Sequence, residues 1–157
     1  MRFFTTALTL LSCASIAMCT PTLTPATVCD PNASGPLLAA RQKASIKDFA
    51  NIFLVEKDVQ KAFDKYIPGD FVQHDPWTLS GRQNAIDVLI PIWPTVSFSN
   101  IHAYAGEGYG TLHVKRTSGS DNYAFVSKLK FQGTCFVEHW SVEQQIFGTE
   151  PNPIAFF

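Results

Sequence analysis

The spacing of the hydrophobic residues changes near residue 95. Before that point, apolar residues recur every three or four positions, as they do in amphipathic helices. After it, they lie in short alternating runs rich in β-branched and aromatic residues, which is typical of strands. A chain with helices first and strands second folds with its helices packed on one face of a sheet. The pattern therefore predicts a single α+β domain.

Three helices are expected in the first part of the chain. Apolar stripes at helical spacing cover residues 38–53 and 59–66, and a turn sequence follows the second stripe. The third helix begins with a capping box in which Ser80 is the cap. Pro91 and Pro94 are expected to end this helix, because proline disrupts a helix interior.

Four strands are expected in the second part of the chain. They cover approximately residues 96–105, 109–116, 123–131 and 135–145. Short turns rich in Gly, Ser and Asn separate them. Strands joined by such short turns pair in an antiparallel meander.

The first residues have the features of a secretory signal peptide. Arg2 precedes an uncharged, apolar stretch that runs to Met18, and small residues precede a cleavage position after residue 19. The apolar stretch is shorter than the roughly 20 residues that a bilayer-spanning helix needs. We therefore expect residues 1–19 to be removed, which leaves a secreted, extracellular protein without a membrane anchor.

The remaining chain divides into three parts. Residues 20–36 form a Pro-rich lead-in, residues 37–147 form the folded domain, and residues 148–157 form a C-terminal tail. The lead-in contains a glycosylation acceptor at Asn32, within the triplet Asn-Ala-Ser.

Composition excludes two classes of protein. The whole chain has 12 Lys and Arg against 13 Asp and Glu, and no run of basic residues, which argues against a nucleic-acid partner. The low charged content of 16% and the aromatic content of 13% argue against a disordered chain. Neither a metal-binding Cys or His spacing nor a phosphate-binding loop is present, so no metal and no cofactor are expected.

Two cysteines remain after signal removal. Cys29 and Cys135 would meet an oxidising environment in a secreted protein, and we expect them to form a disulfide. The alternative is two unpaired thiols that lie too far apart to bridge.

Two segments carry a resemblance to a known family. The first reads YIPGDFVQHDP at 66–76, and the second reads CFVEHWSVEQ at 135–144. Both resemble motifs of the SnoaL-like polyketide cyclase family, within the nuclear transport factor 2-like superfamily. The resemblance covers approximately residues 45–145. It implies a cone-shaped fold with an apolar pocket, and a homodimer formed through the open face of the sheet.

The resemblance also implies a chemistry. Family cyclases act without metal or cofactor on enolisable carbonyl compounds, by acid/base catalysis. We therefore expect cyclisation, isomerisation or dehydration of a polyketide-like or terpenoid carbonyl compound, with a small apolar or aromatic carbonyl ligand as partner. The family's acid/base carboxylate aligns with Ser141, and a second titratable position aligns with Ser127. Because both positions have lost a titratable group, the alternative is a non-catalytic extracellular ligand-binding or interaction protein.

Other residues could supply the acid/base chemistry. Asp75 or His139 is the candidate general base, with His113 and Ser141 as hydrogen-bond donors to an enolate oxygen. Strand alternation places His139 on the same face as Ser141, although the sequence also permits the opposite face, with Trp140, to line the pocket. His113 stands between two apolar residues, and we expect it to line the cavity.

Several further residues are candidates for substrate binding. Aromatic rings can stack on a flat ligand, but they can equally fill a core. The candidates are His74, Trp77, Ser127, Trp140 and Tyr109.

Overall fold

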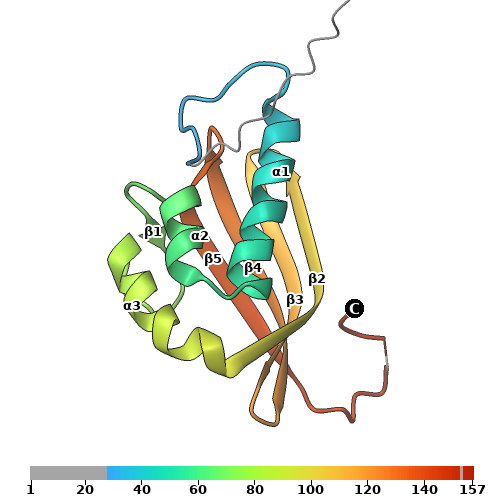
Figure 1. Ribbon diagram of the computed structural model, residues 1–157. Helices are drawn as coiled ribbons and strands as arrows, with labels where there is room; N and C mark the ends of the chain where they lie inside the picture. Colours follow the sequence, from blue (N-terminus) through green and yellow to red (C-terminus); the bar gives the residue numbers. More distant parts are fainter. Residues whose placement is uncertain (1–27, 153) are drawn as a thin grey trace, which may run out of the picture.

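The computed structural model describes residues 28–152 and 154–157. The predicted signal peptide (1–19) and the first part of the lead-in lie outside the described residues. Three α-helices cover one face of a five-stranded sheet (Figure 1). This arrangement confirms the predicted α+β class.

The helices fall where the apolar stripes predict them. The first, α1 (Leu38–Ala50), continues into a π-helical turn over Asn51–Val55. It is followed by α2 (Val59–Tyr66) and α3 (Arg82–Ile92). A 3-10 turn over Trp93–Thr95 leads from α3 into the sheet.

Two details of α3 differ from the prediction. Ser80 is not its cap: Gly81 occupies that position, and the Ser80 hydroxyl instead accepts a hydrogen bond from the Gln73 backbone N–H, at 3.1 Å. Pro91 does not end the helix, which runs on to Ile92. So close to the end of a helix, a proline removes only one of the last hydrogen bonds.

The sheet has the strand order β1-β5-β4-β3-β2. Four strands form the predicted antiparallel meander, and the short β1 pairs with β5 in parallel. Two residues are too few to show an alternating pattern, so β1 was not predicted from the sequence. The strands are β1 (Val72–Gln73), β2 (Val96–Gly106), β3 (Tyr109–Ser118), β4 (Asp121–Gln132) and β5 (Cys135–Ile146).

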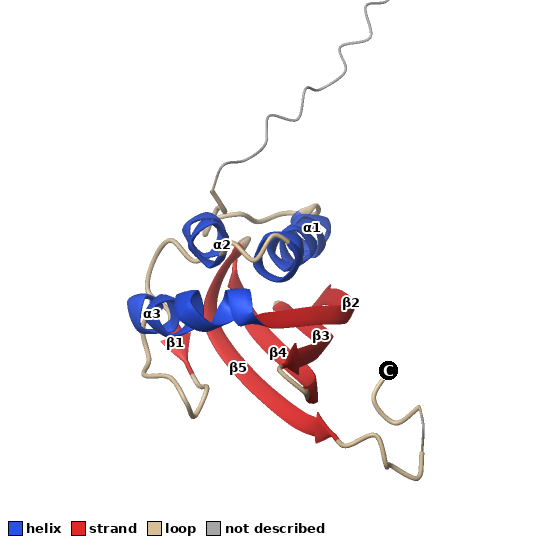
Figure 2. Cartoon of the chain, turned by 60° about the horizontal axis from the view of Figure 1, so that its bottom comes forward, coloured by secondary structure: helices blue, strands red, loops and turns tan. Residues whose placement is uncertain are grey.

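The long strands curve around the helices (Figure 2). Their registers pair Ser127 with Ser141, and Leu129 with His139. Ser127 and Leu129 are buried, so these pairs lie on the face that the helices cover. Residues of the alternate positions lie on the outer face of the sheet.

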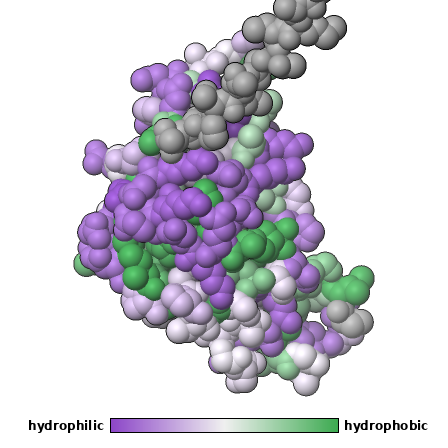
Figure 3. All heavy atoms as spheres, in the orientation of Figure 1, coloured by the Kyte–Doolittle hydropathy of each residue, from purple (hydrophilic) through white to green (hydrophobic). Residues whose placement is uncertain are grey.

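The core lies between the helices and the concave face of the sheet. Phe49 of α1 contacts the rings of Phe53, Tyr66 and Phe136, with ring centroids 5.0 to 5.9 Å apart. Gly110 of β3 allows α1 to approach closely, since a Cβ there would lie 2.9 Å from the Cδ1 atom of Ile46. Hydrophobic patches show between the hydrophilic side chains on the helix-bearing side of the molecule (Figure 3).

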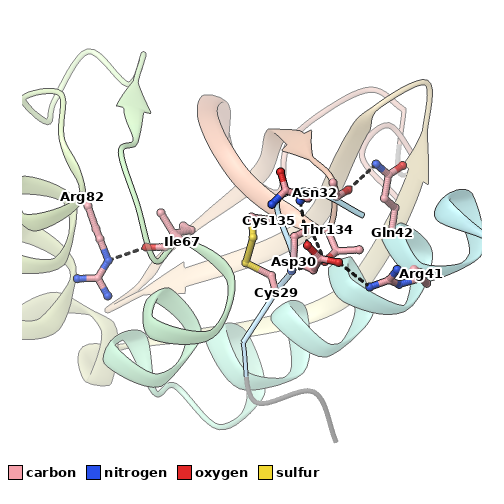
Figure 4. Close-up of a disulfide and its surroundings, with 10 residues drawn as sticks. Cys29, Asp30, Asn32, Arg41, Gln42, Ile67, Arg82, Thr134 and Cys135 are labelled. Atoms are coloured by element: carbon pink, nitrogen blue, oxygen red, sulfur yellow. Dashed lines mark hydrogen bonds and ion pairs between the residues drawn. A yellow bond between two sulfur atoms is a disulfide. The ribbon is translucent and has the colours of Figure 1, made fainter. Parts of the chain in front are cut away.

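The predicted disulfide joins Cys29 to Cys135, and the two Cα atoms lie 5.1 Å apart (Figure 4). Hydrogen bonds between Asp30 and Thr134 run beside it, at 2.8 and 2.9 Å. The Gln42 side chain donates to the Gly133 carbonyl at 2.8 Å. These contacts fix the lead-in and α1 to the turn between β4 and β5.

Among the residues that the structure describes, no helix combines the length and the apolar character needed to cross a membrane.

Candidate functional site

A cavity of about 660 Å³ lies between the helices and the concave face of the sheet. Most of its wall is aromatic or aliphatic, which suits an apolar ligand. The helices and the segments that follow them contribute Phe49, Phe53, Phe63, Ile67, Phe71, Ala85, Leu89 and Trp93. The side chain of Trp77 also lines the cavity, and its 86% exposure places it at the mouth.

One part of the wall is polar. It consists of side chains from the concave face of the sheet, from β1 and from the segment that follows β1. These residues are Gln73, Asp75, Arg116, Ser127, His139, Ser141 and Glu143. Strand alternation therefore places His139 and Ser141 at the cavity, which decides between the two alternatives that the sequence permits.

His139 lies at the centre of a chain of hydrogen bonds. Its Nδ1 atom lies 2.6 Å from Oε1 of Gln73, and its Nε2 atom lies 2.6 Å from Oγ of Ser127. The Gln73 oxygen also accepts the Asp75 backbone N–H, at 3.2 Å, which fixes the orientation of the amide. Since Oε1 can only accept, Nδ1 carries the proton, and Nε2 accepts the Ser127 hydroxyl proton.

The burial of His139 keeps its imidazole neutral. The pKa of His139 is lowered to about 4, mainly because burial disfavours the charged form, and the nearby His74 acts in the same direction. The carboxylate of Asp75 acts in the opposite direction and favours a proton on the ring. At neutral pH, His139 is therefore a hydrogen-bond acceptor toward Ser127.

Asp75 and Ser141 form a second hydrogen-bonded pair at the cavity. The Ser141 hydroxyl donates to Oδ2 of Asp75, across the gap between the β1 segment and β5. The other carboxylate oxygen, Oδ1, accepts the Trp77 backbone N–H at 2.8 Å, which forms an Asx turn. The carboxylate that the sequence suggests at the pocket is thus held in a fixed orientation beside the ligand space.

A charged pair completes the polar wall. The Arg116 guanidinium donates to Glu143 at 2.6 Å and stacks on the ring of Tyr123, 4.5 Å from its centroid. Glu143 is the exposed partner of this pair, with 38% of its side-chain surface accessible. Arg116 is thereby neutralised.

The structure corrects the predicted position of His113. Strand alternation places this residue on the outer face of β3, since Leu112 and Val114 on either side are buried on the inner face. Its ring stacks on Phe157 of the C-terminal tail, with centroids 5.0 Å apart. His113 therefore cannot donate to a ligand in the cavity.

Three predicted substrate-binding residues also lie on the outer face. The rings of His74 and Trp140 stack at 4.5 Å, and Tyr109 meets Trp140 edge-on at 6.3 Å. The Lys128 ammonium lies 4.0 Å from the centre of the Tyr109 ring. Of the five predicted substrate-binding residues, Trp77 and Ser127 line the cavity.

Gln73 and Arg116 are site residues that the sequence analysis did not identify. Gln73 lies within the first family-like segment, two residues before Asp75, so strand alternation along 71–75 could have placed both on one face. Arg116 carries no such signal, because a single arginine near the end of a strand is usually a surface residue.

Among the described residues, no group of three or more His, Cys, Asp or Glu side chains could hold a metal ion.

Comparison with known proteins finds no matching family model and no match among curated proteins. Solved structures do match in fold. A nuclear transport factor 2-like protein of unknown function from Burkholderia xenovorans LB400 aligns with a TM-score of 0.58 and 14% identity, over 74% of this chain and 92% of its own. The chain has the nuclear transport factor 2-like fold.

Two further structures extend this likeness. A SnoaL-like protein of unknown function from Burkholderia thailandensis has a TM-score of 0.53 and 15% identity, over 65% of this chain and 97% of its own. A candidate polyketide cyclase from Acidithiobacillus ferrooxidans has a TM-score of 0.52 and 18% identity, over 66% of this chain and 88% of its own. The predicted resemblance is therefore confirmed at the level of the fold.

Proposed function

We propose that this protein is a secreted enzyme that carries out cofactor-independent acid/base chemistry on an apolar carbonyl compound. The observation that carries this proposal is the position of Asp75, whose carboxylate faces an otherwise mostly apolar cavity of about 660 Å³. A carboxylate held beside the α-carbon of a bound ketone can remove its proton. The candidate cyclase among the structural neighbours supports the same class of chemistry.

Of the two candidate bases, Asp75 fits the task better. The lone pair of His139 Nε2 accepts the Ser127 hydroxyl, so it is not directed at a ligand in the cavity. Asp75 keeps one oxygen on the Trp77 N–H, and its other oxygen contacts only the rotatable hydroxyl of Ser141 among the hydrogen bonds of the described residues. We therefore assign proton abstraction to Asp75.

The hydroxyls of the polar wall are placed to stabilise the product of that step. Once Asp75 has taken up a proton, Ser141 is no longer held by a charged acceptor and can donate to the enolate oxygen. Ser127, directly opposite Ser141 in the register of β4 and β5, becomes a second donor on the same face when its hydroxyl turns from His139 toward the ligand. These two serines take the role that the sequence analysis gave to His113 and Ser141.

The fate of the enolate defines the reaction. Ring closure, double-bond migration and loss of water all begin from an enolate, so cyclisation, isomerisation and dehydration fit the site equally. The ligand space favours a flat, largely apolar substrate such as a polyketide-like or terpenoid compound, because aromatic side chains dominate its wall.

Secretion belongs to the same proposal. The disulfide between Cys29 and Cys135 supports it, because structural disulfides persist in oxidising compartments. Asn32 is exposed, so its side chain is accessible for glycosylation. The homodimer implied by the family resemblance remains a prediction.

One observation favours a second candidate function. The polar groups of the cavity wall are paired with one another: Ser127 with His139, Ser141 with Asp75, and Arg116 with Glu143. The polar groups of this wall satisfy one another's hydrogen bonds. A non-catalytic binding protein for apolar ligands would need the same arrangement.

Isotope exchange distinguishes the two functions. The protein is incubated in heavy water with a panel of enolisable aromatic ketones, β-keto esters and enones, and deuterium uptake is followed by mass spectrometry. The enzyme proposal predicts uptake well above the buffer rate for compounds that bind. Binding without exchange across the panel would favour the carrier function.

A further inference from the structure

We propose that Ser127 is a nucleophile, and that the cavity hydrolyses esters of apolar acids as a second activity. The geometry that points to this is the chain Ser127–His139–Gln73, in which both contacts measure 2.6 Å. It has the order of a catalytic triad: a hydroxyl, an imidazole that accepts its proton, and an oxygen that orients the imidazole. The proposal uses the cavity of the proposed function but does not depend on enolate chemistry.

Gln73 fixes the orientation of the His139 ring. Its Oε1 atom accepts from both the Asp75 N–H and His139 Nδ1, so the amide cannot turn without losing two hydrogen bonds. This orientation keeps the proton on Nδ1 and aims the Nε2 lone pair at Ser127. Gln73 is therefore a positioning residue for His139.

The position of Ser127 suits attack on a bound acyl group. Its side chain lines the cavity although the residue is only 5% exposed, so bulk water has little access to it. Asp75 lies near enough to His139 to favour a proton on the ring, which stabilises the imidazolium that forms during attack.

The reaction needs only water as co-reactant. Ser127 Oγ bonds to the acyl carbon while its proton passes to His139 Nε2, and the alcohol leaves with that proton as the ester bond breaks. Water then attacks the acyl-serine and gives one proton to His139. The carboxylic acid leaves, and the proton returns to Ser127 Oγ.

A serine-directed probe tests the assignment. The full secreted chain is incubated with an alkyl fluorophosphonate, whose P–F bond breaks as a bond to a serine oxygen forms. Peptide mapping by mass spectrometry then locates the added phosphonyl group. We expect the label on Ser127 in the folded protein and not in the denatured protein. An unlabelled Ser127 after prolonged incubation, or a label on another cavity serine instead, would overturn the proposal.

Variants separate catalysis from structure. Ser127→Ala should abolish the label, and Ser120→Ala, in the exposed β3–β4 turn, is the matched control that should keep it. Gln73→Leu should slow labelling at least ten-fold, whereas Gln73→Glu, which keeps the acceptor oxygen, should label at least as fast as wild type. A purely structural Gln73 would slow both variants, which would contradict its positioning role.

The test is independent of the proposed function. If exchange is observed and Ser127 is never labelled, only the ester activity is wrong. If Ser127 is labelled but no bound ketone exchanges, only the enolate chemistry is wrong.

Discussion

His139 shows how burial determines the role of a single residue. A histidine at its ordinary pKa of 6.5 would be partly charged near neutral pH, but this one is neutral because burial lowers its pKa to about 4. Its two ring nitrogens consequently have fixed and different tasks. One donates to Gln73, and the other accepts from Ser127.

This shift has a consequence for stability that can be measured. Between pH 6.5 and pH 4 the unfolded chain binds a proton at His139 that the folded chain does not. The free energy of unfolding should therefore fall as the pH drops through that window, and be unaffected by this group above it. The limit of about 1.4 kcal/mol per pH unit gives a total loss on the order of 3 kcal/mol.

Urea unfolding at pH 7 and pH 4.5 measures the effect. The free energy of unfolding of the wild type should fall by about 1–3 kcal/mol more than that of His139→Gln over this interval, since the variant lacks the titrating ring. Equal losses in both proteins would show that His139 titrates normally in the folded state.

At the residue scale, the sequence predicted which residue types lie near the site better than it predicted the face of the sheet on which each side chain lies. His139 and Ser141 were expected at the pocket, and strand alternation holds for both. The predicted inner position of His113 is wrong, because apolar neighbours in a strand do not indicate an inner position for the residue between them. In a strand those neighbours point to the opposite face, so buried Leu112 and Val114 imply an outward His113.

At the element scale, the packing of α1 on the sheet depends on Gly110. A Cβ at this position would lie 2.9 Å from the Cδ1 of Ile46 and 3.3 Å from the Phe136 ring, and both neighbours are almost fully buried. The helix can lie this close to β3 only because the residue beneath it has no side chain.

Gly110→Ala should therefore destabilise the fold by about 1–3 kcal/mol, the usual cost of overpacking a core. Gly106→Ala is the matched control, because a Cβ there would meet nothing within 4 Å. Chemical denaturation of both variants measures the difference. If both variants unfold at the same denaturant concentration, α1 can move away without cost.

The elements that the sequence missed are the ones without periodicity. The helices and the four long strands carry patterns of eight or more residues, but β1 has two residues and is defined only by its pairing with β5. That pairing places Gln73 beside His139. The main positioning residue of the site thus depends on a long-range contact that no local pattern encodes.

At the scale of the whole molecule, the disulfide connects segments 106 residues apart. It attaches the end of the lead-in to the β4–β5 turn, where Thr134 and Asp30 also hydrogen-bond. Cross-linking such distant positions restricts the unfolded chain strongly.

Replacing both Cys29 and Cys135 by serine should lower the free energy of unfolding by about 3–5 kcal/mol, in the chain-entropy account. Guanidinium unfolding of the wild-type and double-variant proteins measures the loss. Thiol counting on the denatured, unreduced wild type should find neither cysteine free. A free thiol at either position, or an unchanged unfolding midpoint, would contradict the structural role of the bridge.

The central claim concerns the whole cavity: a bound carbonyl compound loses its α-proton to Asp75. The most direct measurement is the rate of deuterium exchange into a saturating ketone ligand, compared between wild type and Asp75→Asn. Asp87→Asn, an exposed carboxylate on α3, is the matched control. We predict a loss of at least about 100-fold for Asp75→Asn, with ligand affinity and the control unchanged. Equal exchange rates in wild type and Asp75→Asn would contradict the claim.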